Sequence, residues 1–225
     1  MRSLAMSLNL TSVAAVLEGR SIPIAAYSNS HLQRLNLSLN NFSNSYISPT
    51  FGRFSTLTYL DLSYSYFSGQ IPSEISHLSK LQPLRLSTSA ASRPKLLRLA
   101  THYFKLLLRN LTKLRELDLS GVNISSTIPP NISSCLTTLR LRFTGLYGII
   151  PESIFHWPDL ETLDLRENDQ LSGYFPKTKW NNSASLIELD LGGVNFSHNL
   201  PKFLGYLTSM QSFGTLFVQS LGAYS

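Results

Sequence analysis

The chain has 225 residues, of which 43% are hydrophobic and only 14% are charged, and its formal net charge is +6. The charged fraction is well below the roughly 25% of an ordinary soluble domain, while the hydrophobic content is too high for a disordered chain. A single cysteine, Cys135, excludes an intrachain disulfide framework and a cysteine-based metal site, and no apolar run approaches the ~20 residues of a membrane-spanning helix.

The amino terminus, residues 1–31, contains no internal repeat. Arg2 followed by the largely apolar stretch Leu4–Leu17 resembles a signal peptide, with Ala14 and Ala15 near a cleavage point. Asn9, Thr11 and Ser12 interrupt this stretch, so the alternative is a divergent first segment. We therefore describe 1–31 as a signal-like or divergent amino terminus.

A short pattern, Leu-x-x-Leu-x-Leu, recurs along most of the remaining chain. Its copies begin at Leu32, Leu57, Leu81, Leu114, Leu136, Leu160 and Leu186, and a degraded eighth copy begins at Met210 with Phe213. Successive copies lie 22–26 residues apart, except for one interval of 33 residues. Leucine-rich repeats have periods of ~20–29 residues, and their Leu-x-Leu strands turn alternate side chains to opposite faces. The sequence thus predicts an α/β horseshoe solenoid over residues 32–213, with a parallel concave sheet and an irregular or helical convex side.

Prolines after the strands, at Pro72, Pro129 and Pro151 for example, are expected to turn each coil onto the convex side. The turn that follows the strand normally holds an asparagine that bonds neighbouring coils. Val122 and Val194 occupy this position in two coils, where we expect a less regular ladder.

The 33-residue interval carries an unusual concentration of positive charge. Nine Lys and Arg residues and no Asp or Glu lie between Glu74 and Glu116. The spacing of Lys95, Arg98, His102, Lys105 and Arg109 fits one face of a helix, and Pro94 suits a first helical turn. We therefore predict a convex-side helix over 94–109. Its basic face is either a solvated surface or a contact for an acidic polysaccharide or anionic lipid.

The two ends of the solenoid are expected to be uncapped, because no repeat precedes residue 32 and residues 214–225 form only a short tail. This feature suggests a fragment or a truncated gene product. Cys135, directly before the fifth strand, is expected to be a small buried thiol.

The central outward position of each strand is polar in every coil, and these residues form the predicted ligand-binding strip. After Asn36 in the first coil, the positions are Asp61, Arg85, Asp118, Arg140, Asp164 and Asp190. Strands ~4.8 Å apart allow lateral pairing, but exposed pairs are each worth only ~0–1 kcal/mol. For a single residue a solvated surface is the simpler interpretation, whereas the concave face as a whole is the usual binding surface of a solenoid.

Eight asparagines lie in Asn-x-Ser/Thr sequons, which suggests a secreted glycoprotein. They are Asn9, Asn36, Asn41, Asn110, Asn123, Asn131, Asn181 and Asn195. The alternative is that such strings simply belong to the repeat consensus.

The coil that runs from Leu57 through Ile71-Pro72 resembles the plant-specific repeat subtype. The segments 47–52, 71–81, 110–117 and 179–186 resemble the amino-terminal coils of plant leucine-rich-repeat receptor-like proteins, specifically the Cf-type disease-resistance group. The resemblance covers about residues 28–213. It implies an extracellular or plasma-membrane protein with a cysteine-paired cap, many more coils, a carboxy-terminal membrane anchor and a partner receptor kinase. This chain departs from the pattern by lacking the cap cysteines, the later coils and the anchor.

No nucleophile elbow, phosphate loop, kinase signature or metal-ligand spacing is present, so we expect neither an enzyme nor a cofactor. Nucleic-acid binding is not expected, because no aromatic platform accompanies the basic residues. The first hypothesis is an extracellular module that binds a pathogen-derived or host protein or peptide in defence signalling. The alternatives are a secreted inhibitor of microbial pectin-degrading enzymes and a non-functional truncation.

Overall fold

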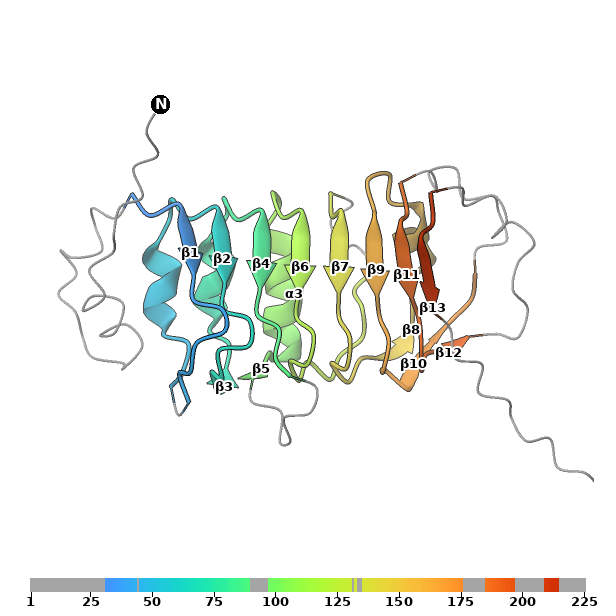
Figure 1. Cartoon of the computed structure of the whole chain (residues 1–225), viewed down its shortest axis with the longest axis horizontal. Helices are drawn as coiled ribbons and strands as arrows, with labels where there is room; N and C mark the ends of the chain where they lie inside the picture. The colour runs from blue at the N-terminus through green and yellow to red at the C-terminus, as the bar shows by residue number, and fades with distance from the viewer. Residues whose placement is uncertain are drawn as a thin grey trace, which may run out of the picture.

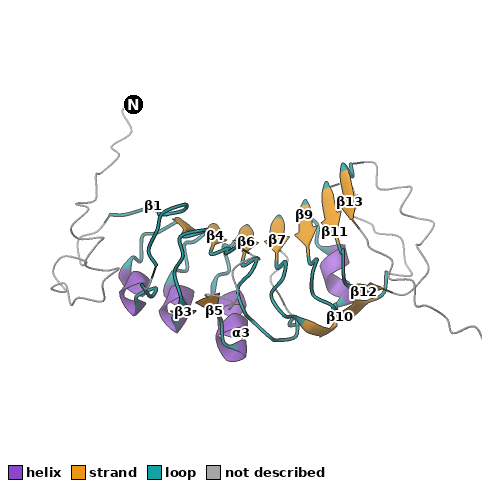
Figure 2. Cartoon of the chain, turned by 60° about the horizontal axis from the view of Figure 1, so that its bottom comes forward, coloured by secondary structure: helices purple, strands orange, loops and turns teal. Residues whose placement is uncertain are grey.

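A computed structural model of the chain describes residues 31–43, 45–89, 97–130, 132, 135–175, 185–196 and 209–214. The described coils stack side by side into a curved solenoid, with one continuous sheet on the concave side (Figures 1 and 2). The predicted leucine-rich-repeat architecture is therefore confirmed.

The concave sheet has eight parallel strands, and each pairs only with the strands of adjacent coils. In spatial order they are β1 (Arg34–Asn36), β2 (Tyr59–Asp61), β4 (Pro83–Arg85), β6 (Glu116–Asp118), β7 (Thr138–Arg140), β9 (Thr162–Asp164), β11 (Glu188–Asp190) and β13 (Ser212–Gly214). From β1 to β11 the central leucine of each strand pairs with that of the next, as in Leu117 with Leu139, and turns into the core. In β13 this position is held by Phe213, which is exposed. A fully buried leucine contributes ~1.5–3 kcal/mol, so this row fixes the register of the whole sheet.

The convex side carries short helices and two small parallel sheets (Figure 2). The helices are η1 (Pro49–Arg53), η2 (Ser73–His77), α3 (Thr101–Asn110) and η3 (Glu152–His156). The small sheets pair β3 (Gly69–Gln70) with β5 (Leu97–Arg98), and β8 (Tyr147–Ile149) with β10 (Gln170–Gly173) and β12 (Asn195–Phe196). Pro72 and Pro151 directly precede η2 and η3, which agrees with the predicted role of the prolines.

The predicted helix over 94–109 is found, but it begins only at Thr101. Leu97 and Leu99 are buried while Arg98 is exposed, and this alternation of period two suits the strand β5 rather than a helix. From Thr101 onward the buried residues Phe104, Leu107 and Leu108 follow helical spacing.

The basic face predicted for this helix is therefore wrong in part. Arg98 lies in β5, whereas His102, Lys105 and Arg109 are exposed on α3. Lys95 and Pro94 lie outside the described residues.

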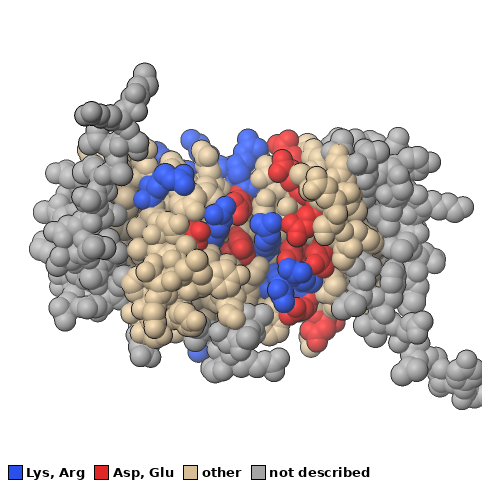
Figure 3. Space-filling view, in the orientation of Figure 1, with Lys and Arg blue, Asp and Glu red and all other residues tan. Residues whose placement is uncertain are grey.

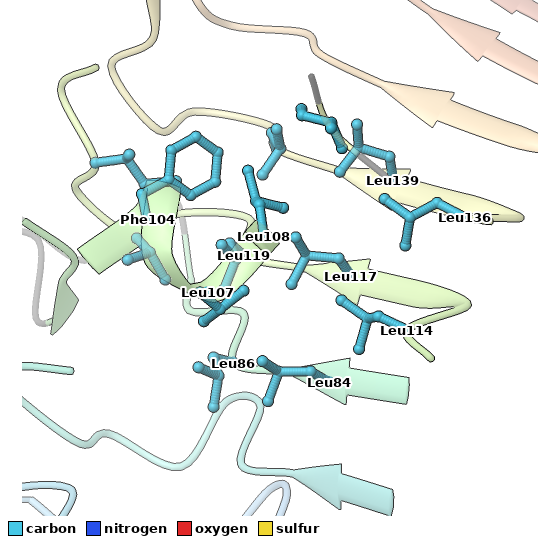
Figure 4. Close-up of a cluster of buried hydrophobic side chains, with 14 of the residues drawn as sticks. Leu84, Leu86, Phe104, Leu107, Leu108, Leu114, Leu117, Leu119, Leu136 and Leu139 are labelled. Atoms are coloured by element: carbon cyan, nitrogen blue, oxygen red, sulfur yellow. The ribbon is translucent and has the colours of Figure 1, made fainter. Parts of the chain in front are cut away.

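The apolar face of α3 packs onto the strand leucines of its own and the neighbouring coils. Figure 4 shows Phe104, Leu107 and Leu108 turned toward the row of leucines that includes Leu117 and Leu119. The longer coil thus replaces a five-residue 3₁₀ helix with a ten-residue α-helix and keeps the same core.

Asn168 ties two coils together through its buried side chain. Its Nδ2 donates to the carbonyl oxygens of Leu165 (2.8 Å) and Leu141 (2.9 Å), while its Oδ1 accepts the N–H groups of Thr144 (3.1 Å) and Leu146 (3.0 Å). Asn40 occupies the same turn position in the first coil, yet it is exposed and bonds only within its own turn.

The expectation of a less regular ladder at Val122 and Val194 is wrong for the concave sheet. The register runs unbroken through both coils, and the main-chain N–H of each valine closes the turn on a leucine of its own coil (both 3.0 Å). Both valine side chains are buried, so apolar contact replaces the asparagine hydrogen bonds.

The expectation of a buried thiol at Cys135 is also wrong, because Cys135 is exposed. It lies three residues before its strand, in the outer turn that Lys80, Lys113 and Asp159 occupy in other coils. The repeat register, rather than the apolar character of the thiol, decides its exposure.

The Asn168→Ala variant should lower the free energy of unfolding by about 3 kcal/mol, because it leaves several buried backbone groups without partners. Asn40→Ala is the matched control and should cost below about 1 kcal/mol. Urea denaturation of the two variants measures the difference. Equal losses at both positions would contradict the role assigned to Asn168.

Candidate ligand-binding face

The predicted strip is assembled by the parallel register of the concave sheet. Asn36 pairs with Asp61, Asp61 with Arg85, and the row continues in register through the remaining strands. We call this set the concave row: Asn36, Asp61, Arg85, Asp118, Arg140, Asp164 and Asp190. All its predicted members are therefore brought together on one face.

The concave row is less exposed than the sequence predicts. Asp61 and Asp164 are buried, with relative exposures of 6% and 2%. Their Oδ1 atoms accept the backbone N–H groups of Ser63 (3.0 Å) and Arg166 (3.2 Å), two residues further on. The same bond is formed at Asn36, Asp118 and Asp190, so each of these side chains closes the end of its own strand.

The two row arginines pair mainly with glutamates that lie two positions before the row residues of their strands. Arg85 donates from Nε and Nη2 to the two oxygens of Glu116 (both 2.7 Å). Its Nη1 lies farther from its row neighbour, at 3.6 Å from Oδ2 of Asp61. Arg140 lies 3.2 Å from Glu188 and 4.0 Å from Glu116. The bond to Glu116 raises the pKa of the Arg85 guanidinium further above its usual range. Lateral pairing within the row itself occurs only at Asp61 and Arg85 among the described ion pairs.

Asp118 is left without a charged partner by this arrangement. It lies between Arg85 and Arg140 in the row, but both guanidiniums turn to glutamates. Asp118 forms no ion pair with any described residue, and its Oδ1 is taken by the Ser120 N–H. Its second oxygen therefore has no charged partner among the described residues.

Aromatic and cationic groups stack at the amino-terminal end of the face. The Arg34 guanidinium carbon lies 4.0 Å from the centre of the Tyr59 ring, and Arg85 donates to the Tyr59 hydroxyl (3.1 Å). A cation above an aromatic face is attracted by the ring quadrupole. Tyr59 therefore joins the end of the sheet to the central charge network.

The carboxy-terminal end of the face holds two carboxylates around one arginine. Arg166 lies 3.2 Å from Asp164 and 2.8 Å from Asp190. Burial raises the pKa of the Asp164 carboxyl to about 6, and the nearby Asp190 and Glu188 add to this rise. The N–H and the charge of Arg166 act in the opposite direction.

The face also includes four residues that the repeat pattern did not single out, namely Tyr59, Glu116, Glu188 and Arg166. A signal for the first three was present, because strand residues two apart point to the same side. Glu116 and Asp118 share a face on this rule, as do Glu188 and Asp190. Figure 3 shows the result as interleaved positive and negative side chains across the middle of the sheet.

Five of the eight sequon asparagines lie within the described residues, and three of them share a local geometry. The Ser Oγ donates to the Asn Oδ1 at Asn36 (2.7 Å), Asn41 (2.6 Å) and Asn123 (2.6 Å). Asn195 is exposed and Asn110 is half-buried. The remaining three, Asn9, Asn131 and Asn181, lie outside the described residues.

Within the described ranges, no three His, Cys, Asp or Glu side chains are grouped so as to hold a metal ion. The same part of the chain contains no helix with the length and apolar character to cross a bilayer.

Comparison with known proteins gives consistent relatives. The Leucine Rich Repeat family model matches residues 56–78 and 113–135. Receptor-like proteins 9DC1 and Cf-9 of Solanum pimpinellifolium are each 55% identical to the chain over 181 residues. The match covers 80% of this chain but 20% of either relative, so the chain spans about one fifth of their length. The resemblance to Cf-type receptor-like proteins is thereby confirmed.

Solved structures add receptor ectodomains of Arabidopsis thaliana. The leucine-rich-repeat ectodomain of the receptor kinase GASSHO1/SCHENGEN3, in complex with CASPARIAN STRIP INTEGRITY FACTOR 2, has a TM-score of 0.71 and 27% identity. That match covers 88% of this chain and 23% of the ectodomain. The HAESA ectodomain, in complex with an extended IDA peptide hormone, has a TM-score of 0.66 and 28% identity, and the match covers 81% and 29% of the two chains.

The raised pKa of Asp164 predicts a pH-dependent stability. The folded state holds this proton more tightly than the unfolded state, so stability falls as the pH rises from about 4 to about 6. Asp164→Asn keeps the acceptor for the Arg166 N–H and should remove a contribution on the order of 3 kcal/mol across this range.

The measurement is the free energy of unfolding of both proteins between pH 4 and 7. Asp159→Asn, which removes an exposed carboxylate paired with Arg115, is the control. Parallel pH profiles for the wild type and Asp164→Asn would show that the Asp164 carboxyl does not titrate in this range.

Proposed function

We propose that this leucine-rich-repeat chain is an extracellular recognition module of a receptor-like protein. Its concave face binds a pathogen-derived or host protein or peptide in defence signalling, and it does so without catalysis. The proposal draws on the receptor-like relatives and on the two receptor ectodomains solved with peptide ligands. Signalling would pass to a partner receptor kinase.

The observation that carries the proposal is the preorganised concave face. Bidentate bonds to Glu116 fix the Arg85 guanidinium, while Glu188 holds Arg140. Fixed charged groups lower the ordering cost of binding and select partners by charge pattern. The row carboxylates accept backbone N–H groups, which suits a rigid docking surface better than a pair of acid–base catalysts.

Asp118 and Arg140 are the two row residues best placed to contact a ligand. Asp118 has an oxygen outside the ion-pair network, and the Arg140 side chain is 34% exposed. We propose that a cationic ligand group lies on Asp118, with an acidic or carbonyl group beside Arg140.

The test uses peptides selected from a random phage-displayed library on the immobilised wild-type chain. These peptides should bind the Asp118→Asn variant and the Arg140→Gln variant each about tenfold more weakly than they bind the wild type. Asp118→Asn retains the acceptor for the Ser120 N–H, so the loss reports on charge rather than on folding. Lys105→Gln, on the exposed side of α3, is the control and should bind as the wild type does. Selected peptides that are indifferent to both concave variants would refute the concave site.

A secreted chain should also carry N-linked glycans. Expression in leaf tissue followed by digestion with an N-glycosidase should increase the mobility of the wild-type chain on a denaturing gel. Ser43→Ala, which removes the Asn41 sequon, should reduce the shift by one glycan, whereas Asn40→Gln outside any sequon should not. An unshifted wild-type chain would argue against passage through the secretory pathway.

A further inference from the structure

A second charged surface lies on the convex side, away from the concave row. It consists of Lys80, which follows η2, Lys105 and Arg109 on α3, and Lys113, which follows α3. All four residues are exposed, and we call them the convex basic surface. Because η2 and α3 pack against each other, these side chains belong to neighbouring coils of one surface (Figure 2).

The repeat register sets part of this surface. Pro83 pairs with Glu116, and Lys80 and Lys113 each lie three residues before these strand positions. They therefore occupy equivalent turns of adjacent coils, which lie ~4.8 Å apart in a parallel sheet. Figure 3, which looks onto the concave face, shows Lys and Arg side chains along the upper rim over the first strands and acidic residues farther along the solenoid.

These cations differ from the concave arginines in that they have no carboxylate partner among the described residues. Arg85, Arg140 and Arg166 all lie against carboxylates, whereas Lys80, Lys105 and Lys113 form no ion pair with any described residue. The Nε of Arg109 donates to the amide oxygen of its neighbour Asn110 at 3.5 Å, and Arg109 likewise forms no ion pair within the described part of the chain. Unpaired like charges on one surface produce a positive potential that attracts an anion.

The stretch of sequence that carries these cations contributes little negative charge, and Asp159, in the equivalent turn of a later coil, is paired with Arg115. Glu74 is the only acidic residue between Leu62 and Arg115 in the sequence. It lies in the first turn of η2, at the end opposite Lys80, and packs against Gly52 of η1.

The character of the surface favours a hydrophilic polyanion over a protein or a membrane. Among the described residues between 67 and 146, no large hydrophobic side chain is exposed. Protein interfaces usually depend on aromatic and other apolar anchors, and insertion into a bilayer surface needs an apolar face. Cations spread over adjacent coils suit instead a linear chain with regularly spaced negative groups.

We propose that the convex basic surface binds a linear polycarboxylate polysaccharide of the polyuronate type, independently of the ligand on the concave face. The contacts are ion pairs and hydrogen bonds between the uronate carboxylates and the ammonium and guanidinium groups of the four residues. Binding at this surface would hold the solenoid on an acidic polymer while its concave face remains open.

The test uses sodium polygalacturonate as the probe and the full chain as the protein. The triple variant Lys80→Gln/Lys105→Gln/Lys113→Gln should bind about tenfold more weakly than the wild type, because each exposed ion pair contributes modestly. The triple Lys→Arg variant at the same positions keeps the charge and should bind as the wild type does. Added salt should weaken wild-type binding, and neutral dextran should not bind.

Two further controls distinguish loss of polygalacturonate binding at the convex basic surface from failure of the concave site and from misfolding. Asp118→Asn should bind polygalacturonate normally, so failure of the concave site and failure of this proposal are distinguishable. Circular dichroism and the unfolding midpoint confirm that the triple glutamine variant is folded. Three results would overturn the proposal. They are equal polygalacturonate binding by the wild type and the triple glutamine variant, no wild-type binding at low salt, and a preference of the wild type for phosphatidylserine vesicles over polygalacturonate.

Discussion

The shared burial of the strand leucines is the constraint on which the rest of this structure depends. A single coil cannot remove its leucines from water, so each coil packs them against the coils on both sides. This packing holds Leu117 level with Leu84 and Leu139, and it therefore holds the intervening outward residues level as well. A row of charges on the concave face is thus a geometric consequence of an apolar core on the other side of the same strands.

The register has opposite electrostatic results on the two sides of the solenoid. On the concave side, alternate strand positions bring arginines against glutamates, and the charges largely neutralise one another. On the convex side, Lys80 and Lys113 are aligned by the same repeat and form no ion pair with any described residue, while Asp159, in the equivalent turn of a later coil, pairs with Arg115. One surface is therefore preorganised for a partner of defined charge pattern, and the other is a positive field suited to a polyanion.

The sequence predicts the fold well because the leucine period encodes the register directly. The concave row was predicted in full, since a residue between two buried strand leucines has to face outward. The ion pairs of the concave row could not be predicted from the sequence. Arg85 pairs with Glu116 rather than with Asp118, and this depends on how far the arginine side chain extends across the neighbouring strand. The start of α3 was placed too early because the basic spacing over 95–109 fits a helix, while burial of Leu97 and Leu99 favours a strand.

The central claim is that ligands bind on the concave face and not on the small sheets of the convex side. Hydroxyl-radical footprinting of the chain with and without a selected peptide tests it directly, because tyrosines lie on both surfaces. Tyr59 on the concave sheet should become protected, while the exposed Tyr147 in β8 and Tyr174 directly after β10 should react as before. Protection of Tyr147 and Tyr174 with no change at Tyr59 would contradict the account.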